Sequence, residues 1–379
     1  MIASIKSIEV FVFRAPIETP VMTSFGTMFD RPAVIIKIDD NDGYTGWGEI
    51  WCNYPTCGAE HRAKLLETIF APLILKMDTN NPQEAFTYLT KSTHTLAIQT
   101  AEIGPIAQAI SGIDIAIWDI FAQKKNKPLY EILGGTEAVV PVYASGINPV
   151  NTEKIIDRAR NEGFDAFKIK VGFGHDSDVE IIKNVQLTMS ESEKLMVDAN
   201  QAWELNEAIS FFSRINEIPL NWVEEPIRAD RPEKEWQKLS DITNIRLAAG
   251  ENIRGLDLFN KKIKSGNLGV IQPDICKWGG ISANLIVVKE ILNNGIHYCP
   301  HFLGGGIGLI ASAHLLAGSG GDGMLEVDYN VNPLREGLAS PFPKIIDSKI
   351  TLNSLPGLGI TPDLSSLEKY LVYHAVLKN

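Results

Sequence analysis

Cysteine is scarce in this chain of 379 residues, and its few occurrences follow no pattern. Four residues are too few for a disulfide framework, and their spacing matches no zinc site: Cys52, Cys57, Cys276 and Cys299. Such cysteines are typical of buried thiols in a reducing compartment, so we expect a cytoplasmic protein.

Basic clusters and long apolar runs are missing too. The formal net charge is −11, and no run of Lys and Arg interrupts it. We expect no nucleic-acid partner, because an acidic surface repels phosphate backbones. No apolar run reaches the length of a membrane span, and the alternating start MIASIKSIEVFVF lacks the features of a signal peptide. We therefore expect a soluble protein without a membrane partner.

The first part of the chain predicts an α+β unit. Two stretches of alternating apolar residues, Ile5–Phe13 and Ala33–Asp39, predict antiparallel strands. Apolar residues at three- and four-residue spacing predict the helices that follow: His61–Leu75, Pro82–Leu89 and Ile103–Lys124. Strands and helices segregated in this way are typical of a separate unit, which we place at residues 1–128.

The rest of the chain has a different rhythm, in which eight short apolar runs alternate with helical patterns. Ionisable residues end seven consecutive runs, 23–28 residues apart: Lys170, Asp198, Glu224, Glu251, Asp274, His301 and Glu326. That interval fits one strand, one helix and two loops, which predicts a β/α barrel with all seven groups at one end. A doubly wound sheet gives a similar alternation, but no G-x-G-x-x-G follows the first strand. We place the barrel at residues 129–345 and expect residues 346–379 to return to the first unit.

Three of these ends are carboxylates on successive runs, Asp198, Glu224 and Glu251. Like charges that converge in a partly dry site need compensation, and a hard cation such as Mg²⁺ provides it. No Cys or His cluster accompanies them, which disfavours zinc. Three separate surface acids are the plainer alternative, but equivalent positions on three strands favour one site. Glu225 is predicted to face away from Glu224, so that only one of the two is a ligand.

Two lysines in FKIKVG, Lys168 and Lys170, lie two residues apart and share a strand face, predicted to be the barrel interior. Two such lysines lower each other's pKa, which makes one of them a usable base near neutral pH. Two solvated lysines on an edge strand are the alternative, which the neighbouring carboxylates disfavour.

Asp274 and His301 end neighbouring runs on the other side of the predicted ring. A carboxylate beside an imidazole fixes its tautomer and favours its charged form, so the pair can act as a general acid or base. Glu326 would hydrogen-bond a developing oxyanion if it were held protonated. Together the groups predict abstraction of the proton next to a substrate carboxylate through a metal-stabilised enediolate.

These motifs resemble the enolase superfamily, in its mandelate racemase/muconate lactonizing enzyme group and mandelate racemase-like subgroup. They are K-I-K, V-D-A-N, W-V-E-E-P, G-E-N, Q-P-D, P-H and L-E-V-D, with SGIDIAIWDI and LYEILGG before the barrel and LPGLGI after it. The resemblance covers essentially the whole chain. It implies an α/β fold, a modified TIM (β/α)7β-type barrel with an N-terminal α+β capping domain completed by the C-terminal segment. It also implies one Mg²⁺ per subunit, on Asp198, Glu224 and Glu251, and a homo-oligomer, a dimer or an octamer.

The resemblance also implies catalytic roles. Lys170 would be the base on one face of the substrate, and His301, paired with Asp274, the acid or base on the other. Lys168 would neutralise the substrate carboxylate, and Glu326 would hydrogen-bond the enediolate.

Function in the subgroup divides between racemases or epimerases and dehydratases of sugar acids and related hydroxy acids. The P-H-x-L-G-G-G stretch resembles the dehydratases, which favours loss of water over 1,1-proton transfer. A barrel that binds a ligand without turnover is the alternative from another class. Two stretches are predicted to select the substrate, Ile17–Phe29 and Trp51–Thr56. Arg31 is the nearest cationic candidate for a second substrate carboxylate, although an exposed structural arginine is the simpler interpretation.

Overall fold

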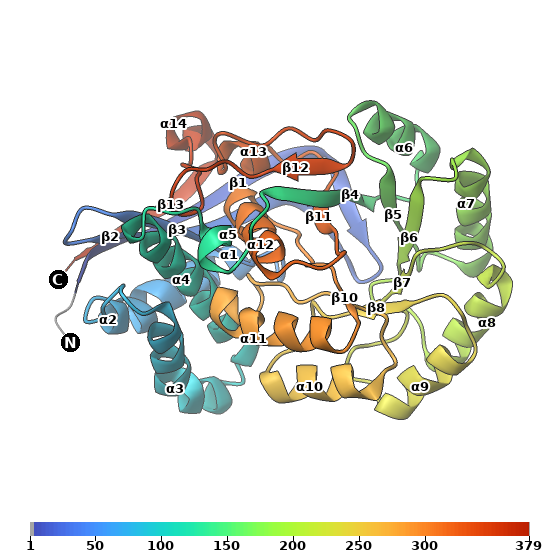
Figure 1. The fold of residues 1–379 in the computed structure, drawn as a ribbon, viewed down its shortest axis with the longest axis horizontal. Helices are drawn as coiled ribbons and strands as arrows, with labels where there is room; N and C mark the ends of the chain where they lie inside the picture. The colour runs from blue at the N-terminus through green and yellow to red at the C-terminus, as the bar shows by residue number, and fades with distance from the viewer. Residues whose placement is uncertain (1–3, 379) are drawn as a thin grey trace.

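Two sheets organise residues 4–378, which are the residues that the computed structural model describes. One is antiparallel, with strand order β13-β1-β2-β3. The other is a curled parallel sheet in which β10-β9-β8-β7-β6-β5-β4-β11 are successive neighbours. Figure 1 shows the antiparallel sheet and its helices on the left and the parallel sheet with its surrounding helices on the right.

The antiparallel sheet and the helices that follow it make up the cap. A long hairpin of β1 (Ile5–Thr23) and β2 (Gly26–Asp40) turns at Ser24 and Phe25, and β3 (Thr45–Ile50) pairs with β2. The predicted strands are therefore present but much longer, because the predicted substrate loop is itself the end of the hairpin. The cap helices are α1 (Gly58–Leu65), the π-helical η1 (Leu66–Phe70), α2 (Ala71–Ile74), α3 (Pro82–Thr100), α4 (Ile103–Lys124) and α5 (Leu129–Ile132).

Helix α4 is the core helix of the cap. It packs backbone to backbone on β3, since a Cβ atom at Gly48 would lie 1.9 Å from the carbonyl oxygen of Gly112. By length and composition α4 would pass as a membrane span, contrary to the sequence-based expectation, but 78% of its most apolar window is buried in the molecule. That burial is typical of a core helix.

The parallel sheet contains the eight predicted runs in order. Its strands are β4 (Val139–Ile147), β5 (Ala166–Lys170), β6 (Lys194–Asp198), β7 (Val223–Glu224), β8 (Leu247–Ala249), β9 (Val270–Ile271), β10 (His297–Tyr298) and β11 (Leu325–Asp328). The helices between them are α6 (Thr152–Asn161), α7 (His175–Thr188), α8 (Leu205–Ile215), α9 (Glu233–Asp241), α10 (Leu256–Ser265), α11 (Gly280–Asn293) and α12 (Gly306–Ser319). Eight strands and seven intervening helices confirm the predicted (β/α)7β arrangement.

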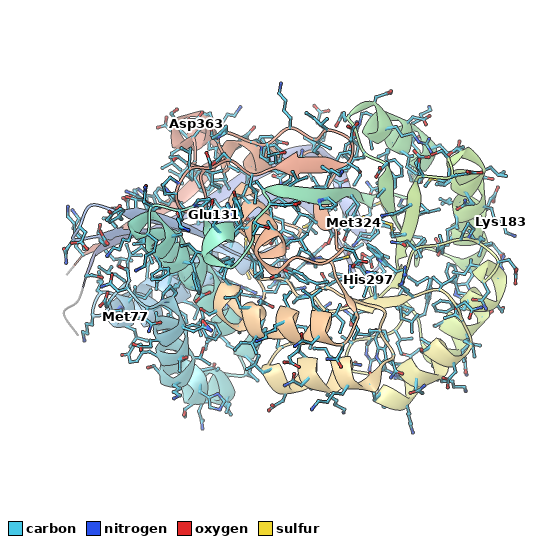
Figure 2. The ribbon with its side chains drawn as sticks, viewed as in Figure 1. Met77, Glu131, Lys183, His297, Met324 and Asp363 are labelled. Carbon is cyan, nitrogen blue, oxygen red and sulfur yellow. The ribbon has the colours of Figure 1, made fainter. Side chains whose placement is uncertain are left out.

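The two end strands of the parallel sheet, β10 and β11, are connected by hydrogen bonds from backbone amides to side chains. The amide of Met324, just before β11, donates to Cys299 Sγ after β10 (3.5 Å), and the amide of Phe302 donates to Glu326 Oε2 (3.1 Å). Figure 2 labels Met324 and His297 beside these two strands and Lys183 on α7, at the outer edge of the barrel.

The C-terminal segment returns to the cap, as the sequence predicts. β12 (Lys349–Thr351) pairs antiparallel with β4, and β13 (Leu371–Lys378) pairs antiparallel with β1. Short helices lie around them: α13 (Pro333–Gly337), α14 (Leu364–Leu367) and the 3-10 helix η2 (Glu368–Tyr370). Figure 1 shows β13 beside β1 and β2, at the same side of the molecule as the N-terminus.

Buried carboxylates of the cap bind the amino ends of two barrel helices. Asp114 on α4 accepts hydrogen bonds from the amides of Ile281 and Ser282 in the first turn of α11 (2.7 and 2.9 Å). Glu49 on β3 accepts hydrogen bonds from the amides of Gly305 and Gly308 at the start of α12. A carboxylate is favourable there because the first amides of a helix have no partner within it.

Candidate active site

The predicted groups gather at the carboxyl ends of the barrel strands. Lys170 on β5 is the register neighbour of Asp198 on β6, which is in turn the neighbour of Glu224 on β7. Glu251 follows β8 after Gly250, where a Cβ atom would lie 2.4 Å from the amide nitrogen of Gln272. Only glycine allows this close approach, which carries the chain from β8 to Glu251.

Both lysines point into the barrel, as their spacing predicts, and there they form ion pairs with the carboxylates. Lys170 Nζ lies 2.5 Å from Asp198 Oδ2 and 2.8 Å from Asn200 Oδ1. Lys168 Nζ lies 2.6 Å from Glu224 Oε2 and 2.8 Å from Glu326 Oε1, and its side chain is 1% exposed.

His301 lies between two carboxylates after β10. Its Nδ1 atom is 2.8 Å from Asp274 Oδ2, and its Nε2 atom is 2.5 Å from Glu251 Oε2. Burial lowers the pKa of His301, but these two carboxylates and Glu326 outweigh burial and hold that pKa well above its ordinary value. This environment favours the charged imidazolium, which has a proton to donate.

The lysine pKa values differ from the expectation. Burial lowers the pKa of both lysines, but Glu224 and Glu326 hold that of Lys168 well above its ordinary value, and Asp198 raises that of Lys170. Lys168 does lower the pKa of Lys170, as the sequence suggests, but its effect is smaller than that of Asp198. The expected low lysine pKa is wrong for this arrangement because carboxylates lie nearer than like charges.

The protonated Glu326 considered from the sequence is also wrong. Lys168 and His301 outweigh burial and lower the pKa of Glu326 to about 2. The carboxylate accepts hydrogen bonds from the hydroxyl of Ser145 and the amide of Phe302. Burial raises the pKa of Glu224 to about 7, so this acid, and not Glu326, is the weaker of the two that share Lys168.

Glu225 does not face away from the site as strand alternation predicts. The chain turns at this residue, with φ +39°, and both of its carboxylate oxygens accept hydrogen bonds from Asn252 Nδ2 at 3.0 Å. Asn252 also donates to Glu251 Oε1 at 2.7 Å. Burial and the neighbouring Glu251 raise the pKa of Glu225 well above its ordinary value.

Two further site residues escaped sequence reasoning. Gln272 donates from Nε2 to Glu224 Oε2 at 2.7 Å; its place two residues before Asp274 was the available signal. Lys277 donates to Asn252 Oδ1 (3.0 Å), lies 3.5 Å from Glu251 and covers the ring of Trp51 at 4.6 Å. No spacing rule points to Lys277, since it lies in a turn after Asp274.

The backbone is strained at the same edge. Asn200 and Gln201 follow Asp198 with φ +45° and +64°, and Glu225 follows Glu224 with φ +39°. Left-handed conformations of this kind cost about 1–3 kcal/mol each and are concentrated at functional sites.

The donors fit a magnesium ion by their chemistry and charge. Among residues 4–378, no three His, Cys, Asp or Glu side chains converge closely enough, as they lie, to hold a metal. Each of Asp198, Glu224 and Glu251 is paired instead with a lysine or histidine. The site nevertheless contains six carboxylates against three lysines and one histidine: Asp198, Glu224, Glu225, Glu251, Asp274 and Glu326 against Lys168, Lys170, Lys277 and His301. A divalent cation with oxygen ligands would offset that excess of negative charge.

Both predicted substrate loops reach the mouth of the barrel. At the hairpin tip, Ser24 Oγ donates to the carbonyl of Asn200 beside the Lys170 side of the site (2.8 Å). After β3, Asn53 Nδ2 donates to the carbonyl of Leu303 beside His301 (2.8 Å).

Arg31 differs from both interpretations offered from the sequence. It is 1% exposed and forms a buried ion pair with Asp328 at the end of β11. It is structural but not exposed, and its charge is already balanced by Asp328.

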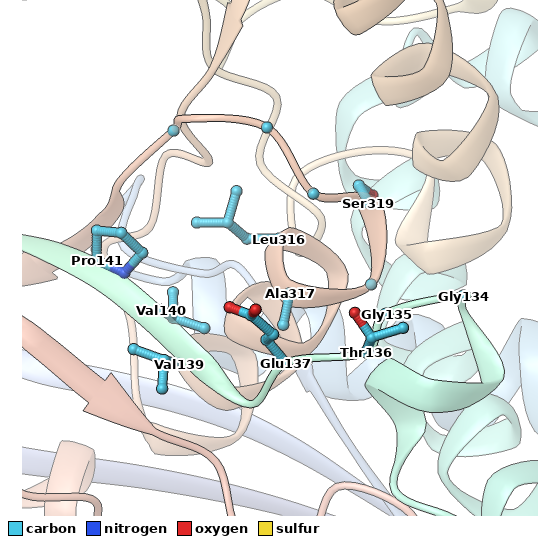
Figure 3. Close-up of a pocket in the computed structure, with 14 residues that line it drawn as sticks. Gly134, Gly135, Thr136, Glu137, Val139, Val140, Pro141, Leu316, Ala317 and Ser319 are labelled. Carbon is cyan, nitrogen blue, oxygen red and sulfur yellow. The ribbon is translucent and has the colours of Figure 1, made fainter.

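A separate hollow of about 270 Å³ lies at the opposite end of the barrel, between the start of β4 and the end of α12 (Figure 3). Glycines and backbone form most of its wall, and Glu137 is the one ionisable side chain among its described lining residues. It contains none of the predicted groups.

Comparison with known proteins identifies the family. Residues 7–134 match the profile "Mandelate racemase / muconate lactonizing enzyme, N-terminal domain", and residues 152–366 match "Enolase C-terminal domain-like". The chain belongs to the mandelate racemase/muconate lactonizing enzyme family of the enolase superfamily, and its fold is the cap and curled parallel barrel of that superfamily.

Individual relatives differ in their named reactions. D-galactarolactone cycloisomerase of Agrobacterium fabrum is 27% identical over 97% of this chain and 98% of its own length. Arabinonate dehydratase of Saccharolobus solfataricus is 28% identical over 89% and 90%. A mandelate racemase/muconate lactonizing enzyme structure from Bordetella bronchiseptica RB50 is 46% identical, with TM-score 0.91 over 97% of this chain and 100% of that one. An enolase structure from Bradyrhizobium, complexed with magnesium and mandelic acid, is 28% identical, with TM-score 0.85 over 98% and 99%. The named relatives are enzymes, and homologous structures contain magnesium.

Proposed function

We propose that this protein removes the α-proton of a hydroxy-carboxylate with the help of one Mg²⁺ per subunit and then eliminates water from the β-carbon. The substrate class is an acid sugar or a related hydroxy acid, and the product is a 2-keto acid. We further propose that the chain works as a homo-oligomer, a dimer or an octamer.

One observation carries the proposal. Lys170 and the hydrogen-bonded pair of His301 and Asp274 come from β5 and from the loops after β10 and β9, on different sides of the ring of strands. A base and an acid placed this way can act on two faces of one substrate. The dehydratase name of one full-length relative supports the second half of the reaction.

Asp198, Glu224 and Glu251 would hold the magnesium ion, which supplies positive charge for the substrate carboxylate. Burial and Lys168 lower the pKa of Lys170, whereas Asp198 and Glu224 raise it. Compensation of the charges of Asp198 and Glu224 would therefore favour the neutral amine. Lys170 Nζ then takes the α-proton, and the electron pair of the C–H bond moves into the carboxylate to form the enediolate. Lys168 lies beside the same carboxylates and adds a second positive charge.

His301 completes the elimination. The imidazolium donates its proton to the β-hydroxyl as the C–O bond breaks, so that water leaves and an enol remains, which tautomerises to the 2-keto acid. Asp274 keeps the ring oriented and charged. Because Glu326 is ionised, its role in this proposal is to orient Lys168 and to accept hydrogen bonds.

A racemase or epimerase is the second candidate. The same two-sided arrangement would let His301 return a proton to the opposite face of the α-carbon, and one relative, from Enterococcus faecalis, is named as a hydrophobic dipeptide epimerase. The two candidates differ in their product.

The test is a screen of hydroxy-carboxylates with Mg²⁺ in D₂O. Dehydration gives a keto acid that semicarbazide traps, whereas racemisation gives α-deuterium and no keto acid. Lys170→Ala and His301→Asn should abolish turnover. Lys183→Ala on the outer surface and His297→Asn at the amino end of β10 are matched controls that should retain it (Figure 2). Full activity in Lys170→Ala would contradict the assignment of the base.

A further inference from the structure

A second cavity lies between the cap and the barrel, away from the mouth described above. It has a volume of about 610 Å³, and its walls come from α3, α4, the residues that precede and begin α10, and the start of α11. Apolar side chains dominate the lining, among them Phe86, Ile106, Leu256 and Trp278. A cavity of this size and character suits a small organic molecule.

One cation enters this apolar cavity without a partner. Arg254 lines the wall, and it has neither a hydrogen bond nor an ion pair with any residue in the described range 4–378. Its Nε atom is buried, and burial lowers the pKa of Arg254. Glu251 acts on this guanidinium only at a distance, where it raises the pKa, and forms no ion pair with it. A buried guanidinium nitrogen without a direct partner is unfavourable, so an anion in the cavity would be stabilised.

The first turn of α4 lies against the same guanidinium. A Cβ atom at Gly104, the second residue of α4, would lie 3.7 Å from the guanidinium carbon of Arg254. The N-cap residue, Glu102, makes no side-chain hydrogen bond to the helix, and its carboxylate pairs with His61 instead (2.9 Å). The positive end of a 22-residue helix and an unpaired arginine therefore lie side by side at one end of the cavity.

We propose that this cavity binds a small amphipathic organic anion. Its carboxylate would meet Arg254 and the first turn of α4, and its apolar body would pack on Ile106 and Trp278. The inference does not depend on the reaction proposed above.

Two segments that line the cavity lie next to active-site residues in the sequence. Arg254 follows Glu251 by three residues, and Trp278 directly follows Lys277, whose ammonium lies 3.5 Å from Glu251. An anion bound here would therefore contact two segments that also carry active-site groups.

Isothermal titration calorimetry with octanoate, and with octan-1-ol as its neutral counterpart, tests the proposal on the full chain. Octanoate should bind the wild type, and octan-1-ol at least about ten-fold more weakly, since a hydrogen bond to a charged group contributes about 1.5–3 kcal/mol. Arg254→Met should weaken octanoate binding by about ten-fold or more. Arg246→Met is the matched control, because that exposed arginine lies at the amino end of β8, opposite the cavity.

Two further variants separate the alternatives. Ala107→Phe, which fills the cavity from α4, should also weaken octanoate binding, whereas Lys170→Ala should leave it unchanged. Equal octanoate affinity in Arg254→Met and wild type, equal affinity for the alcohol, or loss of binding in Lys170→Ala would each overturn the proposal. A further outcome would also overturn it: octanoate fails to bind, and sedimentation velocity shows that Ala107→Phe dissociates an oligomer. A second copy of the chain would then cover the cavity. Circular dichroism establishes that each variant is folded.

Discussion

The ring of Phe25 packs against the ring of Tyr54, with centroids 5.0 Å apart and planes inclined at 60°. This contact joins the tip of the β1–β2 hairpin to the loop after β3, above the mouth of the barrel. Phe25 is otherwise 61% exposed, so the contact with Tyr54 is a principal restraint on its ring, alongside the hydrogen bond of Ser24 to Asn200.

Phe25→Ala should loosen the hairpin tip. An aromatic pair contributes about 0.5–1.5 kcal/mol beyond its buried area, so we expect KM to rise about two- to ten-fold with a smaller change in kcat. Hydrogen exchange should accelerate at residues 23–26. Phe29→Ala is the control, because Phe29 is 72% exposed and makes no aromatic contact within residues 4–378. Equal effects of the two variants would contradict a specific role of the Phe25 contact.

Magnesium should stabilise the folded chain through the three predicted ligands. A ligand at a hundred-fold excess over its Kd stabilises by about 2.7 kcal/mol, so Tm of chelator-treated protein should rise on addition of MgCl₂. Asp198→Asn and Glu251→Gln should lose most of that rise. Glu326→Gln should keep it, since this acid belongs to the same site but is not a predicted ligand. A full Tm shift in Asp198→Asn would remove that residue from the metal site.

His314 should make stability depend on pH. Its Nδ1 atom accepts the amide hydrogen of Tyr130 (3.0 Å), so its Nε2 atom donates to the carbonyl of Leu358 (3.1 Å). Burial lowers the pKa of His314 from 6.5 to about 4. Between these values the unfolded chain binds a proton that the folded chain does not, so stability falls as the pH falls. The contribution should be about 3 kcal/mol in full.

The measurement for His314 is urea unfolding of wild type and His314→Gln between pH 4 and 7.5. The difference between the two proteins isolates this residue from buried acids that titrate in the same range. It should be largest above pH 6.5 and shrink toward pH 4. A difference that does not vary with pH would show that the imidazole titrates normally.

Glu49→Gln should weaken the connection between the cap and the loop after His301. The two carboxylate oxygens of Glu49 accept hydrogen bonds from the backbone amides of Gly305 and Gly308. In the glutamine variant, the side-chain NH₂ group would face one of these backbone N–H groups, and two donors would oppose each other. We expect a loss of about 1–3 kcal/mol in unfolding free energy. Glu60→Gln is the control, because that carboxylate binds Arg14 within the cap and is half exposed. Equal losses in the two variants would contradict the special position of Glu49.

The spacing of residues along the sequence was enough to predict the barrel and the position of its ionisable groups at the carboxyl ends of the strands. The near-regular interval between strand ends depends only on the lengths of a strand, a helix and two loops. The hairpin is longer than the sequence predicts, because the stretch predicted as a capping loop, Ile17–Phe29, continues both strands as far as the turn.

The other incorrect predictions concern the orientation and the pKa values of side chains, which depend on residues of neighbouring strands. Strand alternation placed Glu225 away from the site, but the strand ends at Glu224 and the positive φ of Glu225 turns its side chain toward Asn252. The pKa values of Lys168 and Lys170 depend on carboxylates that are distant in sequence, and no spacing rule ranks those charges against burial. No spacing rule points to Lys277 either, whereas Gln272 lies two residues before Asp274, on the same face of the predicted strand.

The carboxylates of Asp114 and Glu49 hold the cap on the ends of two barrel helices, whereas Ser24 and Phe25 hold the hairpin tip by one hydrogen bond and one ring contact. Fewer contacts therefore hold the hairpin tip than hold the rest of the cap, and we expect substrate entry to displace the tip first. Residues 17–29 contain none of the ionisable groups of the barrel, so we expect an exchange of this segment with that of a relative to leave those groups in place. If residues 17–29 select the substrate, as the sequence predicts, we expect selectivity to change with a segment that contributes little to the attachment of the cap to the barrel.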